Sequence, residues 1–462
     1  MPLRTVGKLP NIVVIAVDTL RPDHLGCYGY DLPTSPAMDA FAERSMVFDT
    51  AIAAGIPTTP SFTTLFTGMH PYAHGIVTHP AGRRLPTGTR TLPEIAAEGG
   101  YATVALDNMV VVGSGRASWF ARGYRDYAGY VYTPFGNQST QLTDRALGFL
   151  QDVRDRPLFL FVHYWDPHTP YGPQPPYDTL HYRPGRTGID LAEVRALAPE
   201  FYDPFLAEMG LRYPEDYDYV VAQYDGEISQ VDRQIGRLLD GIDELDGGDG
   251  TIVLLISDHG ECFGEGDYYF DHHGLYDAVT RIACMLRAPG VPAGRTDALV
   301  SNEDMLPTLC ELAGLRLPEQ PLTGHSLVPL LDGGGRDGRG VRPWVVSVEC
   351  SRQASLAFRT PEAKVILPVV RDADGGSIPD FYGRERLAEP LLFDLTRDPG
   401  EREDLSAQEP DQLRDLLDRL DRWRADVLAR TGAPDPLLTQ PLGLPFERFV
   451  ERMRARAEAQ RR

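Results

Sequence analysis

The sequence predicts an α/β fold: a doubly wound, mostly parallel sheet with a small C-terminal α+β subdomain. Three observations predict it. Short, continuous apolar runs recur through roughly the first 300 residues, as expected of strands that are covered on both faces. Amphipathic segments separate these runs, and such alternation is typical of a parallel sheet. After the glycine-rich stretch 333–340 the pattern changes to short strand candidates followed by one helix.

The larger unit, residues 1–338, contains the expected strands and helices of the parallel sheet. Strands are predicted at Ile12–Val17, Tyr101–Leu106, Leu158–Val162 and Ile252–Ile256. Because apolar residues recur at helical spacing, helices are predicted at Ser35–Glu43, Thr140–Val153 and Asp216–Leu239.

A second unit is expected at residues 339–430. Its strand candidates are Trp344–Val348, Leu356–Arg359, Ala363–Leu367 and Leu391–Leu395, and its helix is predicted at Asp411–Leu428. The remaining tail, 431–462, ends in an arginine-rich helix candidate that starts at Glu447. Such a charged helix is either solvated or a subunit contact, so a homo-oligomer through the tail is one expectation.

Composition narrows the classes of partner. The chain has 462 residues with 45 Lys and Arg against 66 Asp and Glu, a net charge of −21. So acidic a protein repels nucleic acids and anionic membranes, and a small anionic substrate would need local positive charge. Five cysteines without a C-x-x-C pair argue against a disulfide framework. With no apolar run near the length of a membrane span, we expect a cytoplasmic protein.

Polar side chains follow each predicted parallel strand, and ligands bind at that edge of an open α/β sheet. Asp18 follows the first strand, and Asp258 and His259 follow the fourth. Two carboxylates and an imidazole suit one divalent ion, with Zn²⁺ or Mn²⁺ favoured and Ca²⁺ or Mg²⁺ as alternatives. The other strand ends supply Asp107 and Asn108, then His163, Asp166 and His168.

A hydroxyl-rich segment opens a predicted helix at Thr58. It reads Pro57-Thr58-Thr59-Pro60-Ser61-Phe62 and continues to Gly75. Its hydroxyls either cap the helix or present an oxygen to a metal at a helix end that favours anions.

These motifs resemble the sulfatase family within the alkaline phosphatase superfamily. Thr58-x-Pro60-Ser61-x-x-x-Leu65-x-Thr67-Gly68 falls on the family's C-x-P-S-R-x-x-L-x-T-G motif, and Ser257–Glu261 on its second metal loop. The similarity runs from about Asn11 to Leu428. It implies a metal held by Asp18, Thr58, Asp258 and His259.

The departures from the family pattern concern the nucleophile. Sulfatases carry a Cys or Ser that is oxidised to formylglycine, whereas this sequence has Thr58, whose oxidation would give a ketone. Phe62 replaces the motif arginine, Thr19 replaces a second metal-binding Asp, and His259 stands where calcium sulfatases often have Asn. We therefore expect no formylglycine and a Thr58 alkoxide, as in phosphodiesterase and phosphonate monoester hydrolase relatives.

Several histidines are candidate substrate contacts by the same resemblance. His168 and His273 are expected to act in catalysis beside Thr58, and the expected substrate-binding residues are Asn108, His168, His272, His273 and His74. His74 is equally consistent with a loop anchor, and His163 and His70 are interpreted as structural. A second metal on Asp166, His168 and His273 is a weaker alternative. The proline- and aromatic-rich insert 173–217 is expected to cover the pocket.

Three functions follow, in order of preference. The first is hydrolysis of phosphodiesters or phosphonate monoesters through Thr58. The second is a sulfate ester hydrolase that works without formylglycine. The third is a non-catalytic anion-binding protein, which the three expected buried ionisable groups argue against.

Overall fold

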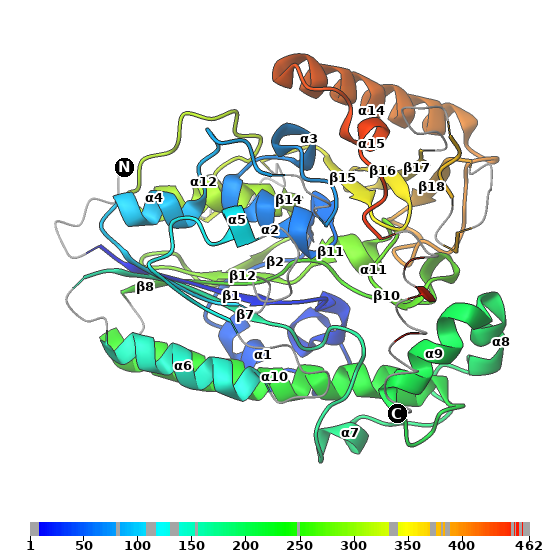
Figure 1. Ribbon diagram of the computed structural model, residues 1–462, viewed down its shortest axis with the longest axis horizontal. Helices are drawn as coiled ribbons and strands as arrows, with labels where there is room; N and C mark the ends of the chain where they lie inside the picture. Colours follow the sequence, from blue (N-terminus) through cyan, green and yellow to red (C-terminus); the bar gives the residue numbers. More distant parts are fainter. Residues whose placement is uncertain are drawn as a thin grey trace.

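A twisted sheet of eight strands forms the centre of the computed structural model (Figure 1). The structure describes residues 9–79, 84–107, 117–129, 138–152, 156–246, 250–331, 341–369, 376–379, 382–383, 389–444, 448, 450–451 and 455. The strand order is β13 (Gly294–Thr296), β2 (Met46–Phe48), β12 (Cys284–Arg287), β8 (Thr251–Ser257), β1 (Asn11–Val17), β7 (Leu158–Tyr164), β5 (Ala102–Leu106) and β6 (Asp126–Ala128). From β8 to β6 the strands are parallel, and β12 is antiparallel to both of its neighbours.

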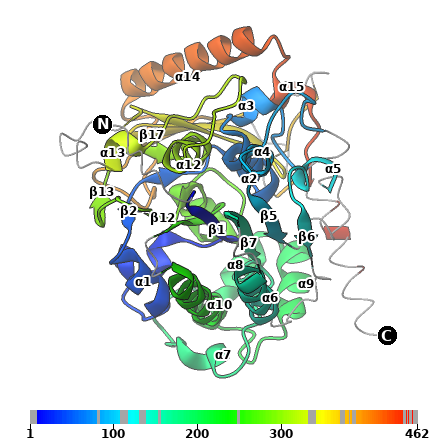
Figure 2. The same cartoon turned by 90° about the vertical axis from the view of Figure 1, so that its left-hand side faces the viewer.

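Helices cover both faces of this sheet, as Figure 2 shows. One face carries α1 (Pro36–Ala42), α6 (Gln138–Asp152) and α10 (Tyr217–Asp246); the other carries α2 (Thr58–Thr67), α4 (Leu92–Glu98) and α12 (Met305–Ala313). Alternate residues of β1 therefore enter different cores: Ile12, Val14 and Ala16 join one, and Val13, Ile15 and Val17 the other. Burial on both faces explains why the strand sequences are apolar without interruption.

The C-terminal subdomain is a five-stranded sheet covered by one long helix. Its order is β18 (Leu391–Asp394), β17 (Ala363–Pro368), β16 (Ala354–Arg359), β15 (Val345–Cys350) and β4 (Gly55–Ile56). Helix α14 (Pro410–Thr431) lies over it. The strand β4 comes from the larger unit and pairs in parallel with β15. The sheet of the subdomain thus includes a strand that ends two residues before Thr58.

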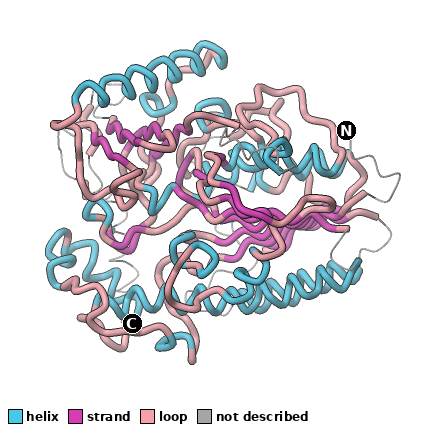
Figure 3. The backbone as a smooth tube through the Cα atoms, turned by 180° about the vertical axis from the view of Figure 1, so that it is seen from behind, coloured by secondary structure: helices cyan, strands magenta, loops and turns pink. Residues whose placement is uncertain are grey.

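The remaining described elements are shorter, and Figure 3 shows the backbone as a whole from behind. The helices are α3 (Pro71–His74), α5 (Ala117–Phe120), α7 (Tyr177–Leu180), α8 (Leu191–Leu197), α9 (Pro199–Met209), α11 (Asp277–Thr280), α13 (Val328–Leu331) and α15 (Pro436–Thr439). The strands are β3 (Ala51–Ile52), β9 (Cys262–Phe263), β10 (Tyr269–Asp271), β11 (Arg281–Ile282) and β14 (Val300–Ser301). Four single turns of 3-10 helix lie at Pro22–His24, Gly26–Tyr28, Glu265–Asp267 and Asn302–Asp304.

The predicted elements correspond to observed ones, with boundaries that differ by a few residues. The long helix extends to Asp246, beyond the predicted end at Leu239. Most of the predicted tail helix and its subunit contact lie outside the described residues. Among the residues searched, none of the helices has the length and apolar character needed to cross a membrane.

Candidate active site

The ends of the central parallel strands bring the predicted metal ligands together. Asp18 follows β1, and Asp258 and His259 follow β8, the strand paired with β1. Their ligand atoms lie within 4.8 Å of one another. The Nε2 atom of His259 is 3.3 Å from Asp258 Oδ2 and 3.8 Å from Asp18 Oδ1. All three residues are buried.

The buried atoms of this cluster fit a divalent cation. Among the described residues, Oδ1 of Asp18 and Oδ2 of Asp258 have no hydrogen-bond partner, and Oδ2 of Asp18 faces Nε2 of His163 at 3.3 Å. Buried carboxylate oxygens are rarely left in this state unless an ion binds them. His259 donates from Nδ1 to the Gly260 carbonyl at 3.0 Å, so its Nε2 carries the lone pair that faces the cluster. Burial and the neighbouring Asp18 raise the pKa of Asp258 to about 6, which reflects excess negative charge.

Thr58 enters the cluster from the other layer of the fold. It is the first residue of α2, and its Oγ1 lies 3.3 Å from His259 Nε2. The next turn of α2 is fixed to the same loop, since Ser61 Oγ donates to the Asp258 carbonyl at 2.7 Å. The predicted convergence of Asp18, Thr58, Asp258 and His259 is therefore present in the structure.

Phe62 fills the space that follows Thr58 on α2. It is buried and packs edge-on against His163, with ring centroids 4.7 Å apart, and against Phe161 at 5.6 Å. An apolar core thus occupies the motif position at which sulfatases carry an arginine. Nothing at this position supplies the polar contact that the resemblance associates with formylglycine.

His163 was interpreted as structural, but it contacts the cluster directly. Its Nε2 lies 3.3 Å from Asp18 Oδ2, and its Nδ1 lies 2.8 Å from Asp107 Oδ1. Burial alone would lower the pKa of the ring; the bonds to Asp107 and Asp18 outweigh burial and raise the pKa to about 10. Asp107 and His163 therefore orient Asp18. The signal in the sequence was their position at the ends of two neighbouring strands, β5 and β7.

A row of histidine rings extends from the cluster. The ring of His272 stacks on that of His259 at 4.9 Å, and the ring of His168 lies 4.7 Å from His272. His168 donates from Nδ1 to the Thr169 carbonyl at 2.5 Å, which leaves Nε2 for other partners. His273 faces the other way, with Nδ1 3.0 Å from Glu349 Oε1 and 2.9 Å from Ser351 Oγ. Of the two adjacent histidines, His272 lies nearer the cluster.

The C-terminal subdomain contributes two charged side chains that the sequence analysis missed. Glu349, on β15, contacts His273 and accepts from the backbone N–H of Gly274 at 2.9 Å. Arg352, in the β15–β16 turn, lies 2.5 Å from Asp271 Oδ2 and above the ring of Phe201. Both are buried, and the available signal was a charged residue within or just after an apolar strand.

Asp271, His272 and His273 form a second group with metal-ligand geometry. It differs from the predicted alternative of Asp166, His168 and His273. Because Arg352 already neutralises Asp271, this group offers less negative charge to a cation than the Asp18–Asp258 cluster does. Phe201 belongs to α9, so the predicted covering insert also borders this group.

Asn108 and His74 are the two remaining predicted substrate contacts. Asn108 lies outside the described residues. His74 is buried, its Nε2 lies 3.1 Å from Thr64 Oγ1, and its Nδ1 accepts from the Ile76 N–H at 3.1 Å. With both ring nitrogens engaged inside the fold, the loop-anchor alternative fits His74 better than substrate contact.

Known proteins can now be compared with this geometry. A family model described as sulfatase matches residues 10–315. The chain belongs to the sulfatase family. It is thus an ester hydrolase of the alkaline phosphatase superfamily, whose sulfatase-fold members typically bind a divalent metal.

Relatives of this sulfatase-family chain include two curated sulfatases. It is 25% identical over 436 residues to the Delta 4,5-hexuronate-2-O-sulfatase of Bacteroides thetaiotaomicron, covering 86% of this chain and 84% of that one. It is 27% identical over 462 residues to human arylsulfatase A, covering 86% and 83%. The solved phosphonate monoester hydrolase of Agrobacterium radiobacter superposes with a TM-score of 0.70 at 21% identity, covering 91% and 96%. That structure supports the fold alone.

Proposed function

We propose that this sulfatase-family hydrolase cleaves phosphodiesters or phosphonate monoesters, with Thr58 as the nucleophile. The observation that carries the proposal is the position of Thr58 Oγ1, 3.3 Å from His259 Nε2 at the edge of the Asp18–Asp258 cluster. A hydroxyl is present where sulfatases carry the residue that becomes formylglycine, and Phe62 replaces the supporting arginine.

Asp18, Asp258 and His259 would hold the divalent ion, with Zn²⁺ or Mn²⁺ favoured by the mixed oxygen and nitrogen ligands. When bound, such an ion neutralises the carboxylates and lowers the pKa of a neighbouring hydroxyl.

The protein residues then account for two displacement steps. Thr58 Oγ1 attacks phosphorus in line, so a bond from Oγ1 to phosphorus forms while the bond to the leaving oxygen breaks, and the hydroxyl proton of Thr58 passes through solvent to the leaving oxygen. His168 and His272 lie on the open side of the cluster, and burial lowers the pKa of both rings. The neutral His272 ring donates one N–H hydrogen bond to a phosphoryl oxygen, and His168, whose Nδ1 donates to the Thr169 carbonyl, can accept a proton of the attacking water at Nε2. Water next attacks phosphorus, and Thr58 leaves with its hydroxyl restored.

The second candidate is hydrolysis of a sulfate ester by the same Thr58 oxygen. It is favoured by the names of the curated relatives, which are sulfate ester hydrolases. A non-catalytic role is opposed by the buried carboxylate oxygens of Asp18 and Asp258, since uncompensated buried charge is costly.

A rate panel on the purified, metal-analysed protein separates these functions. The substrates are an aryl phosphodiester, an aryl phosphonate monoester, an aryl phosphomonoester and an aryl sulfate. We expect the diester or phosphonate to be fastest, and Thr58→Ala to lower its kcat by at least 1000-fold, about 4 kcal/mol. Thr63→Ala is the matched control, because its hydroxyl only bonds back to the Thr59 carbonyl. A leading aryl sulfate would select the second candidate; absence of turnover and of metal would select the non-catalytic one.

A further inference from the structure

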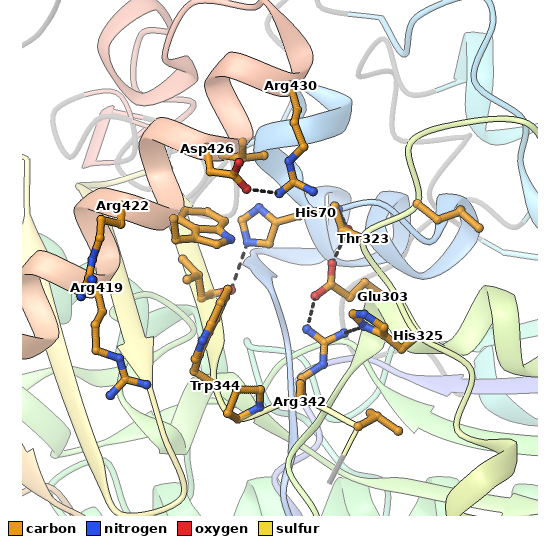
Figure 4. A pocket seen from close by; sticks show the side chains of 16 residues that line it. His70, Glu303, Thr323, His325, Arg342, Trp344, Arg419, Arg422, Asp426 and Arg430 are labelled. Carbon is orange, nitrogen blue, oxygen red and sulfur yellow. Dashed lines mark hydrogen bonds and ion pairs between the residues drawn. The ribbon is translucent and has the colours of Figure 1, made fainter.

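A cavity of about 690 Å³ lies between α14, the start of β15 and the loop that follows α12 (Figure 4). None of the active-site residues Asp18, Thr58, Asp258 and His259 lines it. Its volume is within the range of roughly 300–1,000 Å³ that is usual for small-molecule sites. It is therefore large enough to hold a ligand distinct from the substrate.

The α14 wall of this cavity carries surplus positive charge. Helix α14 has five arginines and five aspartates, yet three of those arginines and one aspartate line the cavity. The aspartate, Asp426, is 2.9 Å from Arg430. The other two, Arg419 and Arg422, contact Asp415 at 3.9 Å and the Asp418 carbonyl at 3.1 Å respectively. Although the whole chain has a net charge of −21, this wall has more arginines than aspartates.

On the opposite wall of the cavity, the charge of Arg342 is neutralised by acidic side chains of the protein. Arg342 Nη1 lies 2.6 Å from Glu303 Oε1, and its other nitrogens bond Asp304. Figure 4 shows the Arg342–Glu303 pair on the side of the cavity away from Arg419 and Arg422. Because Arg430 is paired with Asp426, Arg419 and Arg422 are the α14 arginines that an incoming anion would meet.

Two half-buried indoles complete the lining. Trp344 stacks on Phe358 with ring centroids 5.3 Å apart, and Trp423 packs edge-on against His70 at 4.8 Å. His70 is held by the Val346 carbonyl and the Tyr72 N–H, so it serves as a support. Rigid aromatic faces beside guanidinium groups are suited to a ring that carries an anionic group.

We propose that this cavity binds a small organic anion, a ring bearing a phosphate or sulfate group. Arg419 and Arg422 hold the anionic oxygens, which guanidinium groups recognise through paired N–H donors. Trp344 and Trp423 contact the ring. The site is independent of the chemistry proposed at Thr58.

Calorimetric titration of the metal-loaded protein with phenylphosphonate tests the proposal, because its phosphorus–carbon bond resists hydrolysis. Benzenesulfonate and inorganic phosphate form the other arms, and phenol is the uncharged control. The variants are Arg419→Ala/Arg422→Ala and Arg422→Glu; Arg414→Ala, exposed on the same helix and paired with Asp411, is the matched control. Asp258→Asn disables the active site and leaves the cavity intact.

We expect phenylphosphonate to bind the Asp258→Asn protein. Its affinity should be at least tenfold lower in proteins that combine Asp258→Asn with either Arg419→Ala/Arg422→Ala or Arg422→Glu. Arg414→Ala should leave the affinity unchanged, and circular dichroism should show that all variants are folded. Comparing the affinities for benzenesulfonate and phenylphosphonate shows whether the cavity prefers a sulfur or a phosphorus oxyanion. Weak binding of inorganic phosphate would show that the ring contributes to the affinity. Identical titrations for the parent and both cavity variants, or loss of all binding in Asp258→Asn, would overturn the proposal.

Discussion

Glu349 is one of two residues of the C-terminal subdomain that contact the active-site segment around His272. Its carboxylate contacts His273 and the Gly274 N–H, and these two residues follow His272 directly. Burial raises the pKa of Glu349 to about 7. Removing the side chain would leave the His273 ring and the Gly274 N–H without this acceptor and would free the segment that positions His272.

We therefore expect Glu349→Ala to lower kcat by about 10- to 100-fold, equivalent to the roughly 1–3 kcal/mol cost of an unsatisfied buried group. KM should change less than kcat, and Glu349→Asp should restore part of the rate. Gln353→Ala is the matched control, since it removes one N–H donor to Glu349 Oε2, at 3.1 Å, and an acceptor of the Tyr268 hydroxyl, but keeps the carboxylate that accepts from Gly274. Equal kcat values for wild type and Glu349→Ala would exclude the positioning role.

The strand-end residues were predictable, and the contacts from distant segments were not. Asp18, Asp258 and His259 could be placed because parallel strands present their carboxyl ends at one edge. Thr58 was located through the family motif. Glu349 lies on a strand of another sheet and Arg352 in the turn after it, and no local pattern connects either residue with Asp271 or His273.

Helix α1 depends on a cap supplied by α10. The Ser35 hydroxyl lies near Asp39 and the Gly26 N–H, so it does not cap the helix that it precedes. Asp232 accepts instead from the N–H groups of Ala37 and Met38 at 3.0 and 2.8 Å. Sequence periodicity located both helices, but this capping contact spans 195 residues and has no local signature.

Replacement of Asp232 by Ala should lower the free energy of unfolding by about 1–2 kcal/mol, the usual cost of losing a helix cap. The free energy of unfolding of Asp232→Asn should lie between those of wild type and Asp232→Ala, because the asparagine amide keeps only one of the two acceptor oxygens. Urea unfolding followed by circular dichroism measures the difference. Asp240→Ala, at an exposed position of α10, serves as the control and should stay within about 0.5 kcal/mol of wild type. A loss in Asp240→Ala equal to that in Asp232→Ala would contradict the assignment.

At the scale of the whole molecule, a buried ion network joins the two units. Asp277 of α11 contacts Arg359 of β16 at 3.1 Å and Lys364 of β17 at 2.9 Å. Although burial opposes ionisation, these two cations hold the pKa of Asp277 well below its usual range. Because β4 also pairs with β15, the subdomain is attached both by a strand and by this network. The predicted boundary at residue 338 lies outside the described residues, and the segments before and after it share an interface.

The network predicts a defined acid sensitivity. A carboxylate with a depressed folded-state pKa stabilises the fold above its unfolded pKa of about 3.9 and loses that contribution as the pH falls below it. Urea unfolding between pH 7 and pH 2 should show wild type losing up to about 1.4 kcal/mol per pH unit more than Asp277→Asn, with this extra loss confined to pH values below about 4. Parallel pH profiles for the two proteins would contradict the role of Asp277.

The central claim is that Thr58 carries the phosphoryl or phosphonyl group during turnover. The most direct test is acid quenching of the enzyme during turnover of an aryl phosphonate monoester, followed by peptide mass spectrometry. We expect the peptide that contains Thr58 to gain the mass of the phosphonyl group, and Thr58→Ala to show neither adduct nor turnover. Turnover at the wild-type rate in Thr58→Ala would contradict the account.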